Sequence, residues 1–197
     1  TMSSSHFLPD SLRGPTRAMV FVDGENLAIR YKAGLADAPP EKHVDFLQDV
    51  YVWSHFANIP YHVHCDVIRK YYYTAVQGDD PKIEDVETQL KNIGIEAPRV
   101  FKKKKGRPTK RVDITIATEM LTHAHRGNYD IAILVAGDED YVPLVKAVQD
   151  EGRRVVLWFF EGDPGLSKKL EMAADYFFDI SYFLCEPAEN VRIYYPW

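Results

Sequence analysis

Three aspartates follow two apolar stretches of the chain, where carboxylates could share a cation. Asp23 directly follows the stretch 18–22, and Asp138 and Asp140, with Glu139 between them, follow the stretch 131–136. If both stretches are parallel strands, these side chains reach the same edge of the sheet. Carboxylates gathered in a partly desolvated crevice repel one another unless a cation lies among them. Oxygen ligands without His or Cys favour Mg²⁺ or Mn²⁺ over zinc.

Asp113 adds a fourth carboxylate from the start of a predicted helix. It heads a stripe at helical spacing that is otherwise apolar, formed by Ile116, Ala117, Met120 and Ala124. Taken singly, each acid also has a local structural interpretation, as a turn residue before a glycine or as a helix N-cap. Local caps have no reason to gather at one sheet edge, so the set together favours chemistry.

Asn26, three residues after Asp23, has two interpretations that remain equally open. Its amide could orient a carboxylate or a water molecule, or it could cap the first helix.

A strongly basic segment lies immediately before the helix that carries Asp113. Seven positive charges fall within ten residues: Lys102, Lys103, Lys104, Lys105, Arg107, Lys110 and Arg111. We expect this loop to bind phosphates and guide a polyanion into the acidic edge. If all seven contacted single-stranded RNA, log affinity would fall with log salt at a slope of about −5. A solvated hairpin, a nuclear localisation signal and minor-groove DNA binding are the alternatives.

The elements that would position these residues alternate along the chain. Apolar stretches predict strands at 18–22, 63–76, 97–102, 130–136, 155–160 and 177–180. Helical spacing predicts a helix after Gly24, one through 44–56, and others at 80–94, 112–125, 141–152 and 166–174. Strands that are apolar throughout and alternate with helices form a parallel sheet covered on both faces. We therefore expect an α/β fold, a three-layer α/β/α Rossmann-like sandwich with a mainly parallel sheet.

Length and composition limit the classes of protein that fit. The chain has 197 residues, 46% hydrophobic residues and a net charge of −5, as expected for one folded domain. We expect a disordered tail or expression remnant at 1–16, the domain at 17–185 and an aromatic extension at 186–197. The two cysteines, Cys65 and Cys185, exclude a disulfide framework and favour a reducing, cytoplasmic compartment. The longest apolar runs are too short to span a membrane.

Other sites find weaker support in the sequence. His62 and His64 would share one face of a strand, but strand histidines are usually packed or solvated rather than metal-bound. Tyr71, Tyr72 and Tyr73 are interpreted first as half-buried strand residues, with base stacking as the alternative. The sequence contains no phosphate-cradling glycine-rich loop, which excludes a P-loop nucleotidase.

Several ordered motifs resemble one family. They are VFVDGENL at 20–27, VDI at 112–114, ILVAGDEDYVPLV at 133–145 and GRRV at 152–155, followed by Leu170 and ADYF at 174–177. Together they resemble an NYN domain, of the LabA-like branch of the PIN-like ribonuclease superfamily, over roughly residues 18–180. The resemblance implies a PIN-like sheet and a Mg²⁺- or Mn²⁺-dependent endoribonuclease centre. It implies metal ligation by Asp23, Asp113, Asp138 and Asp140, with Asn26 beside them. Glu139 stands where many relatives have a small hydroxyl residue, and Ala136 where Ser is common.

These observations lead to one leading hypothesis and two alternatives. The first is a metal-dependent endoribonuclease whose partner is single-stranded or structured RNA. The second is a catalytically weak RNA-binding module that acts through partners, and the third is a metal-dependent phosphatase of small phosphoesters. The sequence leaves the oligomeric state open, a homo-oligomer included.

Overall fold

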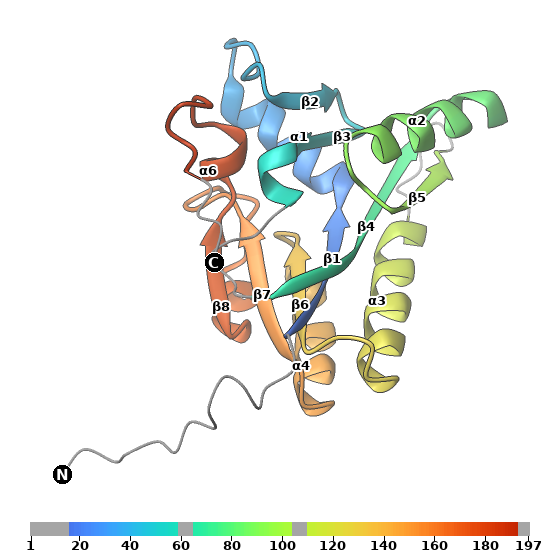
Figure 1. The fold of residues 1–197 in the computed structure, drawn as a ribbon, viewed down its shortest axis with the longest axis vertical. Helices are drawn as coiled ribbons and strands as arrows, with labels where there is room; N and C mark the ends of the chain where they lie inside the picture. The colour runs from blue at the N-terminus through green and yellow to red at the C-terminus, as the bar shows by residue number, and fades with distance from the viewer. Residues whose placement is uncertain (1–15, 59–64, 104–109, 193–197) are drawn as a thin grey trace.

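The computed structural model describes residues 16–58, 65–103 and 110–192 (Figure 1). Its elements are, in chain order, β1 (Arg17–Asp23), α1 (Gly24–Leu35), β2 (Val44–Leu47), β3 (Tyr51–Ser54), a 3₁₀ turn (His55–Asn58), β4 (Asp66–Val76), α2 (Asp80–Asn92), β5 (Ala97–Lys102), α3 (Lys110–His125), β6 (Ile131–Val135), a 3₁₀ turn (Glu139–Tyr141), α4 (Val142–Asp150), β7 (Arg154–Phe159), α5 (Lys168–Ala173), β8 (Tyr176–Asp179) and α6 (Ser181–Leu184).

Six strands form one sheet in the order β5-β4-β1-β6-β7-β8, and every neighbouring pair is parallel. The chain first builds outward from β1 through β4 to β5. It then crosses back to the other side of β1 and continues through β6, β7 and β8. The direction of winding therefore reverses between β1 and β6, and the carboxyl ends at such a switch point are where open α/β sheets bind ligands.

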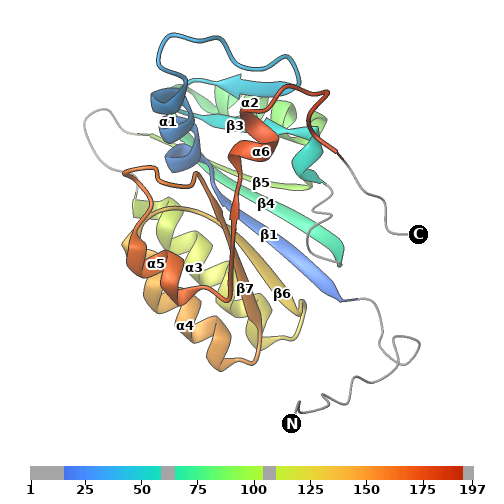
Figure 2. The ribbon, with the colours of Figure 1, turned by 90° about the vertical axis from the view of Figure 1, so that its left-hand side faces the viewer.

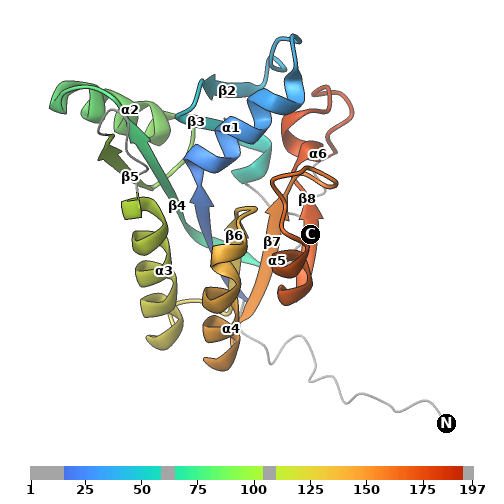
Figure 3. The ribbon, with the colours of Figure 1, turned by 180° about the vertical axis from the view of Figure 1, so that it is seen from behind.

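Helices cover both faces of the sheet and complete three layers (Figure 2). One face packs against α1, α2, α6 and the β2–β3 hairpin, with Val20 and Val22 of β1 in its core. The opposite face packs against α3, α4 and α5, which lie in front of the sheet in Figure 3, with Phe21 in its core. Because successive strand residues point to opposite faces, a strand buried on both sides must be apolar throughout. The predicted α/β/α sandwich with a parallel sheet is confirmed.

The helix predicted through 44–56 is wrong, because the segment forms the antiparallel hairpin β2–β3. Residues 44–54 are rich in β-branched and aromatic types, which favour strands. Asp49 has a φ of 58° in the turn between the two strands, a conformation that a helix excludes. The buried Tyr72 hydroxyl completes the arrangement by donating to the Val52 carbonyl and accepting from its N–H, both at 3.0 Å.

The remaining predicted elements are present with shifts of a few residues at their ends. The strand predicted at 63–76 is observed from Asp66, and residues 63 and 64, with the candidate His64, lie outside the described ranges, as does His62. Beyond α6, Val191 is buried against the face that carries α1. Within the described ranges, no helix is both long and apolar enough to cross a membrane.

Candidate functional site

Asp23 and Asp138 follow the carboxyl ends of β1 and β6, at the switch point of the sheet. Val22 pairs with Val135, so Asp23 and the segment that continues to Asp138 leave the sheet at the same edge. The arrowheads of β1 and β6 point to that edge in Figure 1. Asp23 is only 5% exposed, whereas Asp138 is exposed.

Both residues also serve as caps, so their structural and chemical interpretations coexist. Asp23 Oδ1 accepts from the Asn26 N–H at 3.2 Å and caps α1. Asp138 Oδ1 accepts from the Asp140 N–H at 3.1 Å and caps the 3₁₀ turn before α4. In each case one carboxylate oxygen is held by the backbone, which fixes the direction of the side chain.

A buried tyrosine joins two of the aspartates. The Tyr141 hydroxyl lies 2.9 Å from Asp23 Oδ2 and 3.2 Å from Asp113 Oδ1. Tyr141 is 3% exposed, and Asp113 stands in the first turn of α3. One phenolic proton therefore lies between carboxylates that come from different layers of the fold.

The electrostatics at this edge disfavour negative charge. Burial raises the pKa of Asp23 to about 7, with smaller upward contributions from the charges of Asp113 and Glu25. Burial also raises the pKa of Asp113, together with the charges of Asp138 and Asp140. The hydrogen bond from Tyr141 acts in the opposite direction on both groups. Because the charges of Asp138 and Asp140 act on Asp113, these two acids lie near the Asp23–Asp113 pair.

Glu139 forms an ion pair with a lysine. Its carboxylate lies 2.7 Å from Lys169 Nζ, and this ion pair lowers the pKa of Glu139. Both side chains are exposed, so the pair contributes little to stability. Of the predicted acids, Glu139 is the one neutralised by a described cation.

A bound divalent cation would relieve the repulsion, and the donor set suits Mg²⁺ or Mn²⁺. Asn26 supports this, since its Oδ1 is buried and has no hydrogen-bond partner among the described residues. A buried carbonyl oxygen without a partner is costly, and oxygen ligation by a hard cation would satisfy it. Within the described ranges, no three His, Cys, Asp or Glu side chains are close enough to hold a metal ion together. The residue types and their electrostatics fit the cation, while the side-chain positions do not form a closed coordination shell.

Two contributors escaped the sequence analysis. Tyr141 directly follows Asp140 in the sequence, but nothing in the spacing indicated that its hydroxyl would bridge Asp23 and Asp113. Glu25 lies in the first turn of α1 and forms an ion pair with Lys103, so a lysine of the basic segment reaches the acidic edge. In the sequence, the position of Glu25 two residues after Asp23 was the one indication that it could belong to the site.

The basic segment is described only in part. Lys102 and Arg111 are exposed, and the Arg111 guanidinium lies 5.3 Å from the centre of the Phe101 ring. Lys110 begins α3, while Lys104, Lys105 and Arg107 lie outside the described residues. The side chains of Lys102 and Arg111 are therefore exposed cations, while Lys103 is paired with Glu25 near Asp23.

The tyrosines of β4 are structural. Tyr71, Tyr72 and Tyr73 are each 3% exposed or less, so their rings face core rather than bases. Tyr73 donates to Glu119 at 2.6 Å, and Tyr71 lies 2.9 Å from His123 Nε2.

A family model and two solved structures resemble this chain. The family model described as the NYN domain matches residues 17–181. A protein of unknown function from Vibrio parahaemolyticus superposes with a TM-score of 0.63 at 21% identity, covering 86% of this chain and 96% of that one. At that identity the likeness shows a shared fold.

A second solved structure is described as a UDP-N-acetylglucosamine 2-epimerase from Listeria monocytogenes. It has a TM-score of 0.45 and 11% identity, over 85% of this chain and 40% of that one. No curated protein sequence matches the chain significantly.

Proposed function

Because this chain belongs to the NYN domain family, within the PIN-like nuclease superfamily, we propose that it is a metal-dependent endoribonuclease. The observation that carries the proposal is the Tyr141 bridge between Asp23 and Asp113 at the switch point of the sheet. A cluster of acids with raised pKa values at the ligand-binding edge of a parallel sheet is typical of a catalytic site.

The proposed ligands come from three segments of the chain. Asp23 and Asp138 would bind Mg²⁺ or Mn²⁺ directly, and Asp113 and Asp140 directly or through water. The metal would polarise the scissile phosphate, lower the pKa of the attacking water and stabilise the leaving oxygen. Asn26 would contribute its buried Oδ1 at the same edge. The Tyr141 hydroxyl would keep the carboxylates of Asp23 and Asp113 aligned, because its single proton lies within hydrogen-bonding distance of both.

RNA would approach along the basic segment. Lys102 at the end of β5 and Arg111 in the first turn of α3 are exposed, and with the other basic residues at 103–110 they would bind backbone phosphates. Phosphate contacts position a strand without reading its sequence, so this segment would set the direction of approach. A cytoplasmic location fits the proposal, and the free thiols of Cys65 and Cys185 support it.

The test is cleavage of a labelled single-stranded RNA and a hairpin RNA with Mn²⁺, Mg²⁺ or chelator. We expect cleavage by the unmodified protein with metal, and none with chelator or with Asp138→Asn. Asp150→Asn is the matched control, since Asp150 is also exposed but lies at the opposite end of α4. Cleavage that persists in Asp138→Asn would overturn the proposed centre.

The second candidate is a catalytically weak RNA-binding module. It is favoured by the lack of a three-carboxylate cluster among the described residues. This function predicts RNA binding by both the unmodified protein and Asp138→Asn, without cleavage by either in any metal.

A further inference from the structure

Positive charge collects at one outer edge of the sheet, away from the four site aspartates. A cavity of about 490 Å³ lies there beside β5, the outermost strand, against the C-terminal half of α2. Three of the residues that line it are cations: Arg69, Lys91 and Arg99. In Figures 1 and 3, β5 lies with α2 and α3 on the side of the molecule opposite β8. The whole chain has a net charge of −5, so this local excess of cations indicates an anionic ligand.

The protein neutralises only part of the charge in this cavity. Glu96, an acid of the lining, is held by the buried Lys70 at 2.7 Å. Within the described ranges, neither Arg69 nor Lys91 forms an ion pair, and both side chains are exposed. The other acid of the lining is Glu87. Two exposed cations therefore face a single acid that no lysine or arginine holds among the described residues.

The third cation, Arg99, is positioned by its neighbours. Its Nε donates to Glu119 at 3.0 Å, and its Nη1 donates to the Pro98 carbonyl at 3.4 Å. Glu119 is itself held by the Tyr73 hydroxyl at 2.6 Å, and the guanidinium lies 5.3 Å from the centre of the Tyr71 ring. Among the described residues, three of its five N–H donors remain for a ligand. A guanidinium held in place with donors to spare suits phosphate oxygens.

Three arginines converge beside the C-terminal end of α3. The half-buried His123, in the last turn of α3, responds to the charges around it. Burial lowers the pKa of His123, Glu119 acts in the opposite direction, and the charges of Arg126, Arg69 and Arg99 lower it further. These arginines come from β4, β5 and the segment after α3, and the fold brings them to one place. Because like charges repel, such a group favours a bound anion.

The same face of β5 connects this group to the acidic edge. Side chains two apart on a strand share a face, so Arg99 lies beside Phe101, which packs in the core under α3. The Arg111 guanidinium lies 5.3 Å from the Phe101 ring, in the same helical turn as Asp113. Since α3 has 16 residues, it is about 24 Å long. Cations therefore follow α3 from its first turn to Arg126 just beyond its end.

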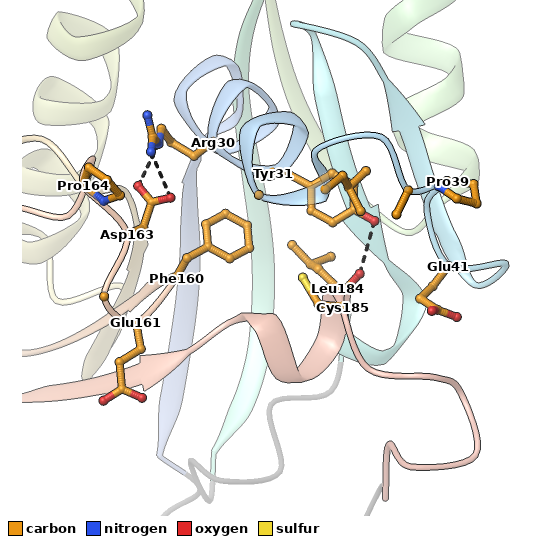
Figure 4. A pocket seen from close by; sticks show the side chains of 14 residues that line it. Arg30, Tyr31, Pro39, Glu41, Phe160, Glu161, Asp163, Pro164, Leu184 and Cys185 are labelled. Atoms are coloured by element: carbon orange, nitrogen blue, oxygen red, sulfur yellow. Dashed lines mark hydrogen bonds and ion pairs between the residues drawn. The ribbon is translucent and has the colours of Figure 1, made fainter.

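The cavity on the other side of the molecule has the opposite charge. It has a volume of about 500 Å³ and surrounds Phe160, between α1 and the loop that follows β7 (Figure 4). Its lining contains one cation, Arg30, and Figure 4 shows this guanidinium bonded to Asp163, at 2.7 and 3.0 Å. Glu41 and Glu161 add two more acids. A phosphate backbone is repelled on this side, so it would leave the acidic edge along α3.

The β5 edge favours a nucleic acid over a protein strand. An outermost strand can pair with a strand of another protein unless its edge is blocked. Pro98 has no N–H to donate to such a partner, and the charged Arg99 and Lys102 also disfavour pairing. A line of cations beside an edge that resists strand pairing fits an extended chain of phosphates.

We propose that the phosphate backbone of the RNA follows α3 from the acidic edge to the cavity beside β5. We call the residues that would bind it the cationic tract: Arg69, Lys91, Arg99 and Arg126. The inference rests on the proposed function, because it assigns the path of the strand beyond the cut. The tract contacts phosphates, so it binds RNA without reading the base sequence.

The first test measures RNA binding to the full chain in chelator, by fluorescence anisotropy at several salt concentrations. The probe is a labelled single-stranded RNA of about 12 nucleotides. Arg69→Gln and Lys91→Ala should each weaken binding about threefold and reduce the slope of log affinity against log salt by about 0.7, and the double variant by about 1.4. Thermal midpoints confirm that the variants fold.

Lys32→Ala is the matched control. Lys32 is an exposed lysine in the last turn of α1, as Lys91 is in the last turn of α2, so both variants lose one charge at the same kind of position. The control should bind RNA with the slope of the unmodified protein. An unchanged slope in the double variant, or an equal effect of Lys32→Ala and Lys91→Ala, would overturn the tract.

Two other anions test the assignment to RNA. Poly-L-glutamate should displace the labelled RNA far less than unlabelled RNA does at the same concentration of charge, and equal displacement would overturn the choice of a phosphate backbone. Inorganic pyrophosphate should bind weakly by calorimetry. Tight pyrophosphate binding that the double variant loses, without any loss of RNA affinity, would make the cavity a site for small phosphates and overturn the path.

Cleavage kinetics with Mn²⁺ separate this inference from the proposed function. The double variant should raise KM for the long RNA about tenfold, and the effect on a dinucleotide, which ends near the aspartates, should be at least about fivefold smaller. RNA binding that depends on the tract, without cleavage in any metal, would overturn the nuclease and keep the tract. Cleavage with the same KM and salt slope in the double variant would overturn the tract and keep the nuclease.

Discussion

The Tyr141 hydroxyl donates a hydrogen bond to Asp23 at 2.9 Å inside the molecule, and the same oxygen lies 3.2 Å from Asp113. The two acids belong to β1 and α3, so one buried phenol connects the central strand to a helix on its face. Burial, and then the charges of Asp23 and Asp113, raise the pKa of Tyr141, so its hydroxyl remains a proton donor at every ordinary pH. It is therefore suited to hold two carboxylates together without competing for a cation.

Replacing Tyr141 with phenylalanine should destabilise the metal-free protein by about 2 kcal/mol at pH 8, because a hydrogen bond to a charged group is lost. The loss should be smaller at pH 5, where Asp23 is protonated. Chemical denaturation at the two pH values measures this loss in the free energy of unfolding. Tyr129→Phe is the matched control, since that buried hydroxyl donates to the neutral Met120 carbonyl at 2.9 Å. A pH dependence equal in the two variants would refute the role assigned to Tyr141.

The raised pKa of Asp23 predicts how the stability of the metal-free protein depends on pH. The pKa of Asp23 is about 7 in the folded state and 3.8 for an unperturbed aspartate, so between these pH values the folded state binds more protons than the unfolded state. The contribution of Asp23 to the free energy of unfolding therefore falls as the pH rises through this window and levels off above pH 7. From pH 5 to pH 8 the fall is on the order of 3 kcal/mol.

Asp23→Asn isolates this contribution, because an amide resembles the protonated acid. In chelator, the variant should gain stability relative to the unmodified protein as the pH rises from 5 to 8. Thermal midpoints of both proteins across this range measure the difference. A constant difference between them would show that Asp23 titrates normally.

The stabilisation of the protein by a bound metal should increase with pH, whereas the contribution of Asp23 to the stability of the metal-free protein decreases. Protons compete with the cation for Asp23 and Asp113, so Mn²⁺ should raise the thermal midpoint more at pH 8 than at pH 6. Asp138→Asn should lose most of this increase, and Asp150→Asn should keep it. An increase that is independent of pH and of Asp138 would place the bound metal elsewhere.

The sequence predicted the sheet because its strands are apolar on both faces, and 18–22 and 131–136 could be recognised without contacts. It misjudged 44–56 because Val44, Leu47 and Tyr51 recur at spacings that also suit a helix. The antiparallel pairing depends on a turn at Asp49 and on Tyr72 from a later strand. Such long-range contacts have no periodic signal in the sequence.

The sequence also predicted the candidate site only where no long-range side-chain contact was involved. The sequence predicted that Asp23 and Asp138 lie at one edge of the sheet, because each follows a strand and parallel strands end at the same edge. The Tyr141 bridge and the pairing of Glu25 with Lys103 depend on side chains from separate elements, which spacing cannot supply. Likewise, the cavity beside Phe160 arises where α1 meets a loop more than a hundred residues later in the chain.

The ion pair between Glu25 and Lys103 predicts a variant that binds RNA more tightly. Glu25→Gln should release Lys103 to contact a phosphate and steepen the slope of log affinity against log salt by about 0.7. Fluorescence anisotropy in chelator at several salt concentrations measures the slope. The double variant Glu25→Gln with Lys103→Ala should lose the gain. Weaker RNA binding by Glu25→Gln would contradict the exchange of partners.

Two glycines of α1 should respond in opposite directions to the same substitution. A Cβ at Gly24 would overlap the buried Tyr72 ring. Among the described residues, a Cβ at Gly34 would have no heavy atom within 4 Å apart from its chain neighbours and the backbone of its own helix. Gly24→Ala should therefore cost about 1–3 kcal/mol through overpacking and displace Tyr72 from its bonds to Val52. Gly34→Ala should stabilise the protein by about 0.5–1 kcal/mol, because alanine is the better helix former.

Thermal midpoints should fall in Gly24→Ala and rise in Gly34→Ala. Since Gly24 directly follows Asp23, the first should also weaken metal binding, and equal midpoints would refute the close approach of α1 to β4.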